Sequence, residues 1–418
     1  MASSLHVEDL HPEPAPERPW LSIVGIGEDG LAGLGDDAKR HIAEAEFVFG
    51  GKRHLGLAAS IIKGEQQQWL SPFDAAMRAL LSLSGRRVCV LASGDPFLHG
   101  VGATIARLVP AAEMTTFPAP SAFSLAAARL GWPLAETETI SLHGKAVEFL
   151  RPLLHPGRRV IALTSDENGP AAVAALLAGS GFGGSTITVL EALGGPRERV
   201  RTARADRFAL ASIDALNVVA ITVEASPAAK ILPLAPGLAD DLYEHDGQIT
   251  KREVRALTLS ALAPRRGELL WDIGAGAGSV ATEWMLADPS LRAIAVEHNP
   301  ERAARIRRNA AALGVPGLAI VEGGAPQALA GLATPQAIFI GGGGSDAGVL
   351  DAAIDALAPS GRLVANAVTL EMEAVLLAHH ASLGGDLVRI AVSRAAPVGS
   401  MQGWRPAMPV TQWAWTKP

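Results

Sequence analysis

Three glycines at alternate positions, Gly274, Gly276 and Gly278, follow an apolar run that contains Asp272 near its end. Such a turn lets a ligand approach the backbone closely, and the free N–H groups of the next helix can bind a polar or anionic group. Glu297 ends the following apolar run, nineteen residues after Gly278, where an acid can bind the two hydroxyls of a ribose. The pattern therefore predicts a nucleotide site, for either a dinucleotide or S-adenosylmethionine.

The spacing of these residues favours the methyl donor. It is G-x-G-x-G, whereas dinucleotide sites use G-x-G-x-x-G. A predicted helix, TKREVRALTLSAL from Thr250, precedes the first strand, and a predicted strand closes the chain after the last helix, as in class I methyltransferases. A two-domain NAD-dependent oxidoreductase remains the alternative.

Further segments could complete this site. VEGGAP (Val321–Pro326) follows the third predicted strand, where an adenine would lie, and IFIGGGG (Ile338–Gly344) ends the fourth. Four successive glycines keep the rim open for a large substrate. Thr250 could either cap its helix or contact the donor. Three basic residues could bind substrate carboxylates: Lys251, Arg252 and Arg255. For Arg255, a place on a solvated basic face is the alternative.

Three loops in the first half of the chain also combine glycine, proline and polar residues. They are Ile23–Leu34, Leu91–Ile105 with its Asp95-Pro96 pair, and Phe117–Pro133, in which a helix is expected to begin at Ser121. Each loop taken alone fits a turn with a capping residue, and turn capping is the alternative role for Asp95. His99 and His143 are the nearest imidazoles, and we expect them to be structural.

Two series of alternating strands and helices must position these loops. Short apolar runs bounded by Gly, Pro or charge indicate buried strands, and Ala-rich periodic segments between them indicate helices. The expected fold class is therefore α/β with two domains. The proline-rich segment Ser226–Asp241 separates the two series and lacks periodicity, which is typical of a linker. The expected organisation is a flexible tail (1–18), a first domain (19–225), a linker (226–241) and a second domain (242–418).

Composition excludes several classes of protein. The 418 residues are 49% hydrophobic and carry a net charge of −6, so neither nucleic acid nor an anionic membrane is an expected partner. No apolar run is long enough to span a membrane, and the first residues do not form a signal peptide, so we expect a cytoplasmic protein. The single cysteine, Cys89, lies in an apolar run and is expected to be buried. No Cys/His cluster indicates a metal site.

The second half resembles the decarboxylating precorrin methyltransferases of cobalamin synthesis. The resemblance rests on YEHDGQITKREVRALTLSALAP, LLWDIGAGAGSVATEW, AVEHNPER, EGGAP and FIGGGG. It implies a tetrapyrrole pocket bordered by the glycine run, with Gly342 and Gly343 beside the substrate. It also implies a set of contacts to S-adenosylmethionine: Thr250, Gly274, Gly276, Gly278, Glu297 and Ala325.

The first half resembles the tetrapyrrole (class III) methyltransferases, whose pattern is a G-x-G-P-G loop, a G-D-P loop and a P-G-x-S-S segment. Here Glu28 replaces the usual proline of the first loop, and Ala119–Ala122 reads APSA. LEALGGPRERV, from Leu190, is similar to the E-N-L-G-G segment of that family. The resemblance implies a substrate cleft shaped by Gly25 and Gly27, and donor contacts at Gly94, Asp95 and Ser121.

Fusion of the two halves in this order resembles the precorrin-6Y methyltransferase (decarboxylating) family. That resemblance implies methylation of precorrin-6B at C5 by the first domain, and methylation at C15 with loss of the ring C acetate carboxylate by the second, giving precorrin-8. It implies one S-adenosylmethionine site per domain, a tetrapyrrole partner and a homo-oligomer. His245 and Lys251 are the candidate proton donors. A cobalt-precorrin substrate and a non-catalytic tetrapyrrole carrier remain alternatives.

Overall fold

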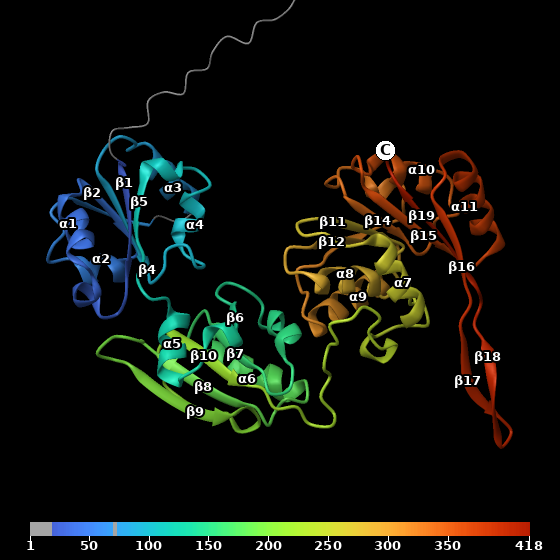
Figure 1. Ribbon diagram of the computed structural model, residues 1–418, viewed down its shortest axis with the longest axis horizontal. Coiled ribbons are helices and arrows are strands. Elements are labelled where there is room, and N and C mark those ends of the chain that lie inside the picture. Colours follow the sequence, from blue (N-terminus) through green and yellow to red (C-terminus); the bar gives the residue numbers. More distant parts are fainter. Residues whose placement is uncertain (1–18, 70–72) are drawn as a thin grey trace, which may run out of the picture. The chain divides into compact units, whose positions relative to one another are not determined.

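The computed structural model describes residues 19–69 and 73–418, which form two compact units (Figure 1). The first unit contains the described residues up to Lys145 together with Gly157–Ala225, and the second contains Ala146–Pro156 and Ser226–Pro418. The tail expected at 1–18 lies outside the described residues. No helix among the described residues is long and apolar enough to cross a membrane.

A parallel sheet with the strand order β3-β2-β4-β1-β5 begins the first unit. Its strands are β1 (Leu21–Ile26), β2 (Phe47–Gly50), β3 (Glu65–Gln68), β4 (Val88–Ser93) and β5 (Met114–Phe117). Alternate residues of β4 face opposite sides, as a strand requires: Cys89 and Leu91 pack towards α1 (Asp36–Glu44) and α2 (Lys52–Ala58), and Val88 and Val90 pack towards α3 (Phe73–Leu81) and α4 (Val101–Ile105). Figure 1 shows these helix pairs on the two sides of the sheet.

A second, mixed sheet completes the first unit, with the order β6-β7-β10-β8-β9. Its strands are β6 (Glu138–Ser141), β7 (Arg159–Leu163), β8 (Thr186–Glu191), β9 (Arg199–Arg204) and β10 (Asn217–Thr222). The helix α5 (Ala122–Leu130) packs on this sheet through Phe123 and Ala126, and α6 (Gly169–Gly179) belongs to the same part of the unit. The chain enters α5 directly after β5, so Ser121 lies where the two sheets are joined.

The second unit is built on one seven-stranded sheet with the order β13-β12-β11-β14-β15-β19-β16. Its strands are β11 (Leu269–Ile273), β12 (Arg292–Glu297), β13 (Ala319–Glu322), β14 (Ala337–Ile340), β15 (Arg362–Ala367), β16 (Asp386–Ile390) and β19 (Val410–Thr416). The first five are parallel, and β19 is antiparallel to both its neighbours. The order reverses between β11 and β14, and ligands of such sheets bind at the carboxyl ends of the strands near this reversal.

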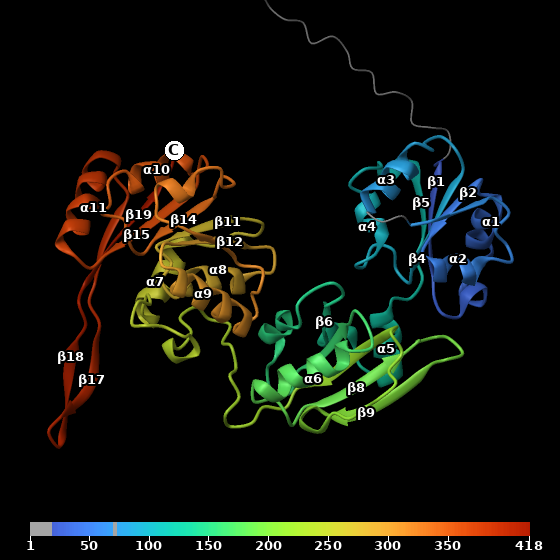
Figure 2. The ribbon, with the colours of Figure 1, turned by 180° about the vertical axis from the view of Figure 1, so that it is seen from behind.

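Five helices cover the two faces of this sheet. Buried residues of α7 (Arg252–Leu262), α8 (Ser279–Ala287) and α9 (Pro300–Ala312) pack against one face, and α10 (Val349–Ala356) and α11 (Leu370–Leu383) cover the other. The predicted α/β class, with parallel sheets in both halves, is confirmed. Between β16 and β19, a hairpin of β17 (Ser393–Val398) and β18 (Met401–Pro406) extends away from the body of this unit in both views (Figures 1 and 2).

Two residues show how the environment sets the state of a side chain. Cys89 is completely buried, as expected, and burial raises the pKa of its thiol to about 12. Arg255 was expected to lie on a solvated basic face or to bind substrate, and both expectations are wrong because its side chain is 0% exposed. It pairs with Glu283 at 2.5 Å and with Asp240 at 3.2 Å.

The segment 226–241 lies in the second unit. Leu232 and Leu238 are buried there in a small cluster with Tyr243 and Leu313. Leu238 also donates its backbone N–H to Glu283 at 3.0 Å. The segment is therefore held by both apolar and polar contacts.

Candidate functional site

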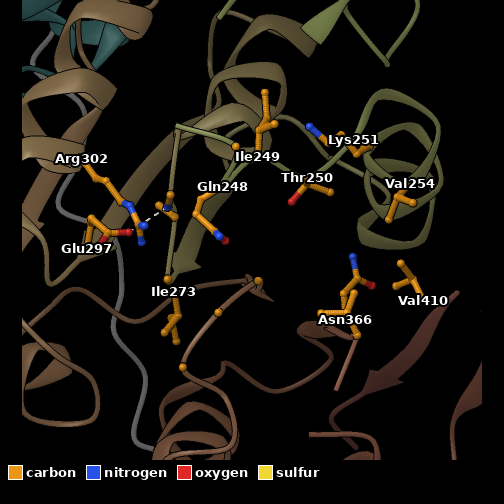
Figure 3. Close-up of a pocket in the computed structure, with 18 of the residues that line it drawn as sticks. Gln248, Ile249, Thr250, Lys251, Val254, Ile273, Glu297, Arg302, Asn366 and Val410 are labelled. Carbon is orange, nitrogen blue, oxygen red and sulfur yellow. Dashed lines mark hydrogen bonds between the residues drawn. The ribbon is translucent and has the colours of Figure 1, made fainter. Parts of the chain in front are cut away.

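A cavity of about 710 Å³ lies in the second unit, beside the ends of β11, β12 and β14 (Figure 3). This is the size of sites that bind small organic molecules and cofactors. The cavity brings together segments that are far apart in the sequence. Several of them follow strand ends on the same edge of the sheet, and the segment before α7 joins them there. Eight predicted site residues line it: Thr250, Lys251, Gly274, Gly276, Glu297, Ala325, Gly342 and Gly343.

The glycine turn after β11 is possible only because it lacks side chains. Gly274 and Gly276 have φ values of +68° and +60°, in the left-handed region that favours glycine. A Cβ atom at position 274 would lie 2.2 Å from the carbonyl oxygen of Gly342, and one at 276 would lie 3.0 Å from that of Gln248. The turn therefore lies against two other backbone segments that line the cavity.

Glu297 holds this turn in place. Its side chain is nearly buried, with Oε2 accepting a hydrogen bond from the Gly276 N–H at 2.8 Å and Oε1 accepting one from the Asn299 N–H at 3.0 Å. An ionised carboxylate has about four lone-pair sites. Glu297 can therefore anchor the turn and still accept hydrogen bonds from ligand hydroxyls.

Asp272, near the end of β11, is a buried acid beneath the turn. Its Oδ2 accepts a hydrogen bond from the Ala281 N–H at 3.0 Å, while its Oδ1 has no partner among the described residues. The pKa of Asp272 is raised to about 7, mainly by burial and also by the nearby charge of Glu297, while the hydrogen bond from the Ala281 N–H partly opposes the increase. The carboxyl thus changes its charge near neutral pH.

The segment before α7 is fixed from behind by the buried Arg255. Its Nη1 donates to the backbone carbonyl of Thr250 at 2.5 Å, next to Lys251. The N-cap of α7 is Lys251, without a side-chain capping bond, so the alternative role of Thr250 as the cap is wrong. Thr250 lies in the cavity wall instead.

Three predicted site residues of this half are not among the residues that line the cavity. A Cβ atom at Gly278 would lie 2.6 Å from Ile306, so this glycine allows α8 and α9 to pack. His245 is exposed, and its Nδ1 accepts a hydrogen bond from the Gly247 N–H at 3.1 Å. Arg252 is exposed, and its backbone and stem lie beside Gly237.

In the first unit, the predicted loops do meet, at the carboxyl ends of β1 and β4. A Cβ atom at Gly25 would lie 1.8 Å from the carbonyl oxygen of Gly94 and 2.8 Å from the backbone nitrogen of Ala119. The Ala119 N–H also donates to the Gly94 carbonyl at 3.2 Å. A Cβ atom at Gly94, which has a φ of +53°, would lie 2.9 Å from the Pro120 carbonyl. Three chain segments therefore touch through their backbones at this point.

The polar side chains of these loops serve the local backbone. The Ser121 hydroxyl caps α5 by accepting from the Ser124 N–H at 3.1 Å. Asp95 Oδ1 accepts a hydrogen bond from the Phe97 N–H at 2.8 Å, so Asp95 has the turn-capping role that was its alternative to contacting the donor. A Cβ atom at Gly27 would lie 2.6 Å from Asp29 Oδ1, so this glycine lies against the Asp29 carboxylate.

Sequence reasoning treated Glu28 only as a departure from a family pattern and missed the cluster around it. Glu28 is 10% exposed and pairs with Arg53, whose Nη2 donates to the Ser93 hydroxyl at 2.7 Å. His54 lies within 2.8 Å of the same hydroxyl, and burial together with the charge of Arg53 lowers its pKa to about 4. The GGKRH sequence after β2 was the available signal, because it places adjacent basic residues at a strand end.

The two halves match two family models. Residues 21–209 match the tetrapyrrole (corrin/porphyrin) methylases, and residues 241–417 match the precorrin methyltransferase domain. The chain is 64% identical to the precorrin-6Y C(5,15)-methyltransferase [decarboxylating] of a Sinorhizobium species, over 97% of this chain and 98% of that protein. The chain belongs to the precorrin-6Y C(5,15)-methyltransferase (decarboxylating) family. The predicted resemblance is thereby confirmed, and the NAD-dependent oxidoreductase alternative is not favoured.

Two further relatives of this family member match less of the chain. The cobalt-precorrin-6B C(15)-methyltransferase (decarboxylating) of Salmonella typhimurium is 37% identical over 179 residues, 41% of this chain and 92% of that protein. The crystal structure of the C-terminal domain of precorrin-6Y C5,15-methyltransferase from Rhodobacter capsulatus is 50% identical. It covers 44% of this chain and 100% of that chain, with a TM-score of 0.43.

Membership of a methyltransferase family implies the use of S-adenosylmethionine, and the cavity of the second unit fits that molecule. The glycine turn lets the backbone at 274 lie against the Gly342 carbonyl, and both segments line the cavity without side chains. The buried carboxylate of Glu297 suits ribose hydroxyls, and Ala325 follows β13 in the position expected beside an adenine. These features come from three different strand ends that line one cavity.

Proposed function

We propose that this chain methylates a precorrin macrocycle at C5 and C15 and removes the carboxylate of its ring C acetate. Full-length relatives support this proposal, because their names state methylation at C5 and C15 and the decarboxylation. The cavity of the second unit is the main structural support, because Glu297 binds the glycine turn there and the side-chain-free Gly342 lies beside that turn. The metal-free precorrin is favoured over cobalt-precorrin, because the cobalt-precorrin relative matches 41% of the chain.

In the second unit, Glu297, Gly274, Gly276, Thr250 and Ala325 would hold S-adenosylmethionine. When bound, this molecule supplies a methyl group attached to a positively charged sulfur. The residues of the chain contribute mainly by positioning, because an electron-rich ring carbon needs orientation more than a strong base. The low-dielectric wall around the turn strengthens the hydrogen bonds that Glu297 makes.

The substrate side of this cavity would begin at Gly342 and Gly343, which are exposed and carry no side chains to block a flat macrocycle. Lys251 is exposed at the cavity and can pair with a substrate carboxylate. Because His245 is not among the cavity-lining residues, the proposal assigns it no part in the reaction. Carbon 15 methylation and decarboxylation are assigned to this unit.

Carbon 5 methylation is assigned to the first unit, with its own donor site. The match of residues 21–209 to the tetrapyrrole methylases supports this assignment. Backbone groups of Gly94 and of the segment before Ser121 would contact the donor there, because the Ser121 hydroxyl and the Asp95 carboxylate already hold local hydrogen bonds.

The test is a reaction of the full chain with precorrin-6B and S-adenosylmethionine whose methyl group carries carbon-13. The expected product contains two labelled methyl groups, at C5 and C15, and one molecule of carbon dioxide is released per macrocycle. A product with a single methyl group, or with its acetate carboxylate intact, would contradict the proposal. Methylation only when cobalt-precorrin is supplied would assign the chain to the other substrate.

A further inference from the structure

Asn366, in β15, is a polar residue of the cavity wall that the proposed function has not used. Its Nδ2 donates a hydrogen bond to the Thr258 hydroxyl at 3.0 Å, and its Oδ1 accepts one from Gln412 Nε2 at 2.9 Å. Asn366 is half-buried and lies at the same edge of the sheet as the glycine turn. It therefore faces the cavity with an amide that is already held on two sides.

The two partners of this amide are rigid. Thr258, in α7, is 0% exposed, and Gln412, the cross-strand partner of Asn366 in β19, is 6% exposed. Gln412 Nε2 also donates to the Thr258 hydroxyl at 3.2 Å, which closes a three-membered network. In this arrangement Gln412 Nε2 donates both to the Thr258 hydroxyl and to the Asn366 oxygen, so the assigned orientations of the two amides agree with one another.

One N–H of Asn366 is left for a ligand. A primary amide carries two N–H groups, and one of those on Nδ2 donates to the Thr258 hydroxyl. A buried network in which each member fixes the next is more rigid than a lone surface side chain. The structure thus offers the cavity one neutral hydrogen-bond donor with a defined direction.

The wall around this donor is apolar. Val254, Ile390 and Val410 are each 8% exposed and form a cluster with Val392, and all four line the cavity. Figure 3 shows Asn366 with Val410 and Val254 on one side of the cavity, while Glu297 and Arg302 lie on the other. Asn366 therefore has apolar neighbours in the cavity wall. Lys251 and the Glu253–Arg394 ion pair, which adjoin Val254 and Val392 in the chain, also line the cavity.

We propose that Asn366 donates a hydrogen bond to the substrate carboxylate that leaves as carbon dioxide, and that Thr258 and Gln412 position it. This inference rests on the proposed function, since it requires decarboxylation in the second unit. Asn366 would be the substrate-contacting residue, and the other two act through it. No assignment of the proton donor is needed.

The chemistry explains why a neutral amide suits this position. In the reaction, the bond between the acetate CH₂ and the carboxylate carbon breaks, carbon dioxide leaves, and the electron pair moves into the conjugated macrocycle. A proton from water then adds to the CH₂ carbon, which becomes a methyl group. The carboxylate loses its charge in this step, so a cation bound to it would stabilise the starting state more than the transition state. An apolar wall with one hydrogen bond orients the carboxylate and favours the loss of its charge.

The cations of the cavity are suited to the carboxylates that remain. Lys251 is exposed, and Arg394 is half exposed and paired with Glu253. Both line the cavity. They can bind the other acidic side chains of the macrocycle without opposing the loss of carbon dioxide.

The experiment compares full-length Asn366→Asp with the wild-type chain. The new carboxylate has the shape of the amide and still accepts from Gln412, but it offers no N–H to the substrate and repels its charge. We expect carbon dioxide released per C15 methyl group to fall at least about 10-fold, the value of a hydrogen bond to a charged group. Binding of S-adenosylhomocysteine and C5 methylation should stay unchanged. Gln402→Glu, which adds the same charge on the exposed β18, is the matched control and should behave as the wild type.

Thr258 provides a second test that does not alter the contacting residue. Thr258→Val keeps the shape and removes the hydroxyl that holds Asn366, whereas Thr258→Ser keeps the hydroxyl. We expect the valine variant to release several-fold less carbon dioxide per C15 methyl group, and the serine variant to restore the ratio. A role in stability alone would lower C15 methylation and decarboxylation together.

Three results would overturn the inference. An unchanged ratio in Asn366→Asp would show that Asn366 does not contact the departing carboxylate, and an equal fall of both activities would assign it to general substrate binding. If Asn366→Asp no longer binds S-adenosylhomocysteine, the Thr258 variants decide the question. An equal ratio of carbon dioxide to C15 methyl groups in Thr258→Val and Thr258→Ser would overturn the inference. A wild-type chain that methylates without releasing carbon dioxide would instead refute the proposed function.

Discussion

The two units use glycine at their strand ends in different ways. In the second unit, Gly274 and Gly276 bend around a cavity, and Glu297 reaches the turn from the neighbouring strand. In the first unit, Gly25 and Gly94 lie backbone to backbone, and the polar groups of Asp95 and Ser121 already have local partners. The comparison teaches that the same glycine pattern can serve a ligand, the packing of the chain, or both.

The largest effect is expected where a side chain would separate the two backbone segments that line the second site. In Gly274→Ala, the Cβ atom would lie 2.2 Å from the Gly342 carbonyl, so the turn must move by about 1 Å. A shift of that size can lower a rate about 100-fold. C15 methylation and decarboxylation should both fall by this factor while C5 methylation persists, as measured by mass spectrometry of the product.

Gly331→Ala is the matched control for this change. Gly331 has a φ of +77°, close to that of Gly274, and a Cβ atom there would meet nothing within 4 Å. It shares the backbone strain and lacks the collision. Equal losses in the two variants would show that backbone strain, and not the collision with the Gly342 carbonyl, causes the effect.

The corresponding change in the first unit, Gly25→Ala, sharpens the comparison. Its Cβ atom would lie 1.8 Å from the Gly94 carbonyl and should displace the loops beside it. We expect C5 methylation to fall about 100-fold with C15 methylation retained. Gly35→Ala, at an N-cap with open space around it, is the control. Loss of C15 methylation in Gly25→Ala would contradict independent sites.

Glu297→Gln should have a smaller effect, confined to the second site. The amide can keep one acceptor for the turn but loses the charge that strengthens bonds to the Gly276 N–H and to ligand hydroxyls. Hydrogen bonds to charged groups contribute about 1.5–3 kcal/mol. We therefore expect S-adenosylhomocysteine to bind one of its sites about 10-fold more weakly in calorimetry. An unchanged affinity at both sites would remove Glu297 from the donor site.

The smallest effect concerns stability and pH. The pKa of Asp272 rises from 3.8 to about 7 on folding, so its folded form retains the proton more strongly, and ionisation opposes folding as the pH rises from about 4 to 7. Between pH 6 and pH 8 the penalty grows by roughly one pKa unit, about 1.4 kcal/mol. Asp272→Asn removes this penalty.

The midpoint of thermal unfolding, followed by tryptophan fluorescence, checks this prediction. The difference between Asp272→Asn and the wild type should become more favourable to the variant by roughly 3–6 °C from pH 6 to pH 8. A difference that does not depend on pH would show that Asp272 does not titrate in this range.

The sequence predicts the strands of the second unit well, because buried parallel strands are continuous apolar runs. The apolar run that was expected to end at Glu297 coincides with β12, and the positions of Gly274 and Glu297 at strand ends follow directly. The hairpin of β17 and β18 was not predicted, since its strands are largely exposed and do not form a buried apolar run. Sequence patterns report burial, and this element has little.

Polar networks were the other part that the sequence could not supply. Arg255 reads as one more charge on an amphipathic helix, and only its partner Glu283, 28 residues away, makes it a buried support for Thr250. Asn366 is an isolated polar residue after the apolar stretch of β15, and its partner Gln412 lies 46 residues further on. Such pairings depend on the register of strands that the local sequence does not determine.

In the proposed function, each unit has its own donor site and the Gly274 turn builds the second. Calorimetric titration of S-adenosylhomocysteine into the full-length chain counts these sites. We expect two bound molecules per wild-type chain and one per Gly274→Ala chain. Two molecules bound by the variant would place the second site elsewhere, and a single molecule bound by the wild type would contradict a donor site in each unit.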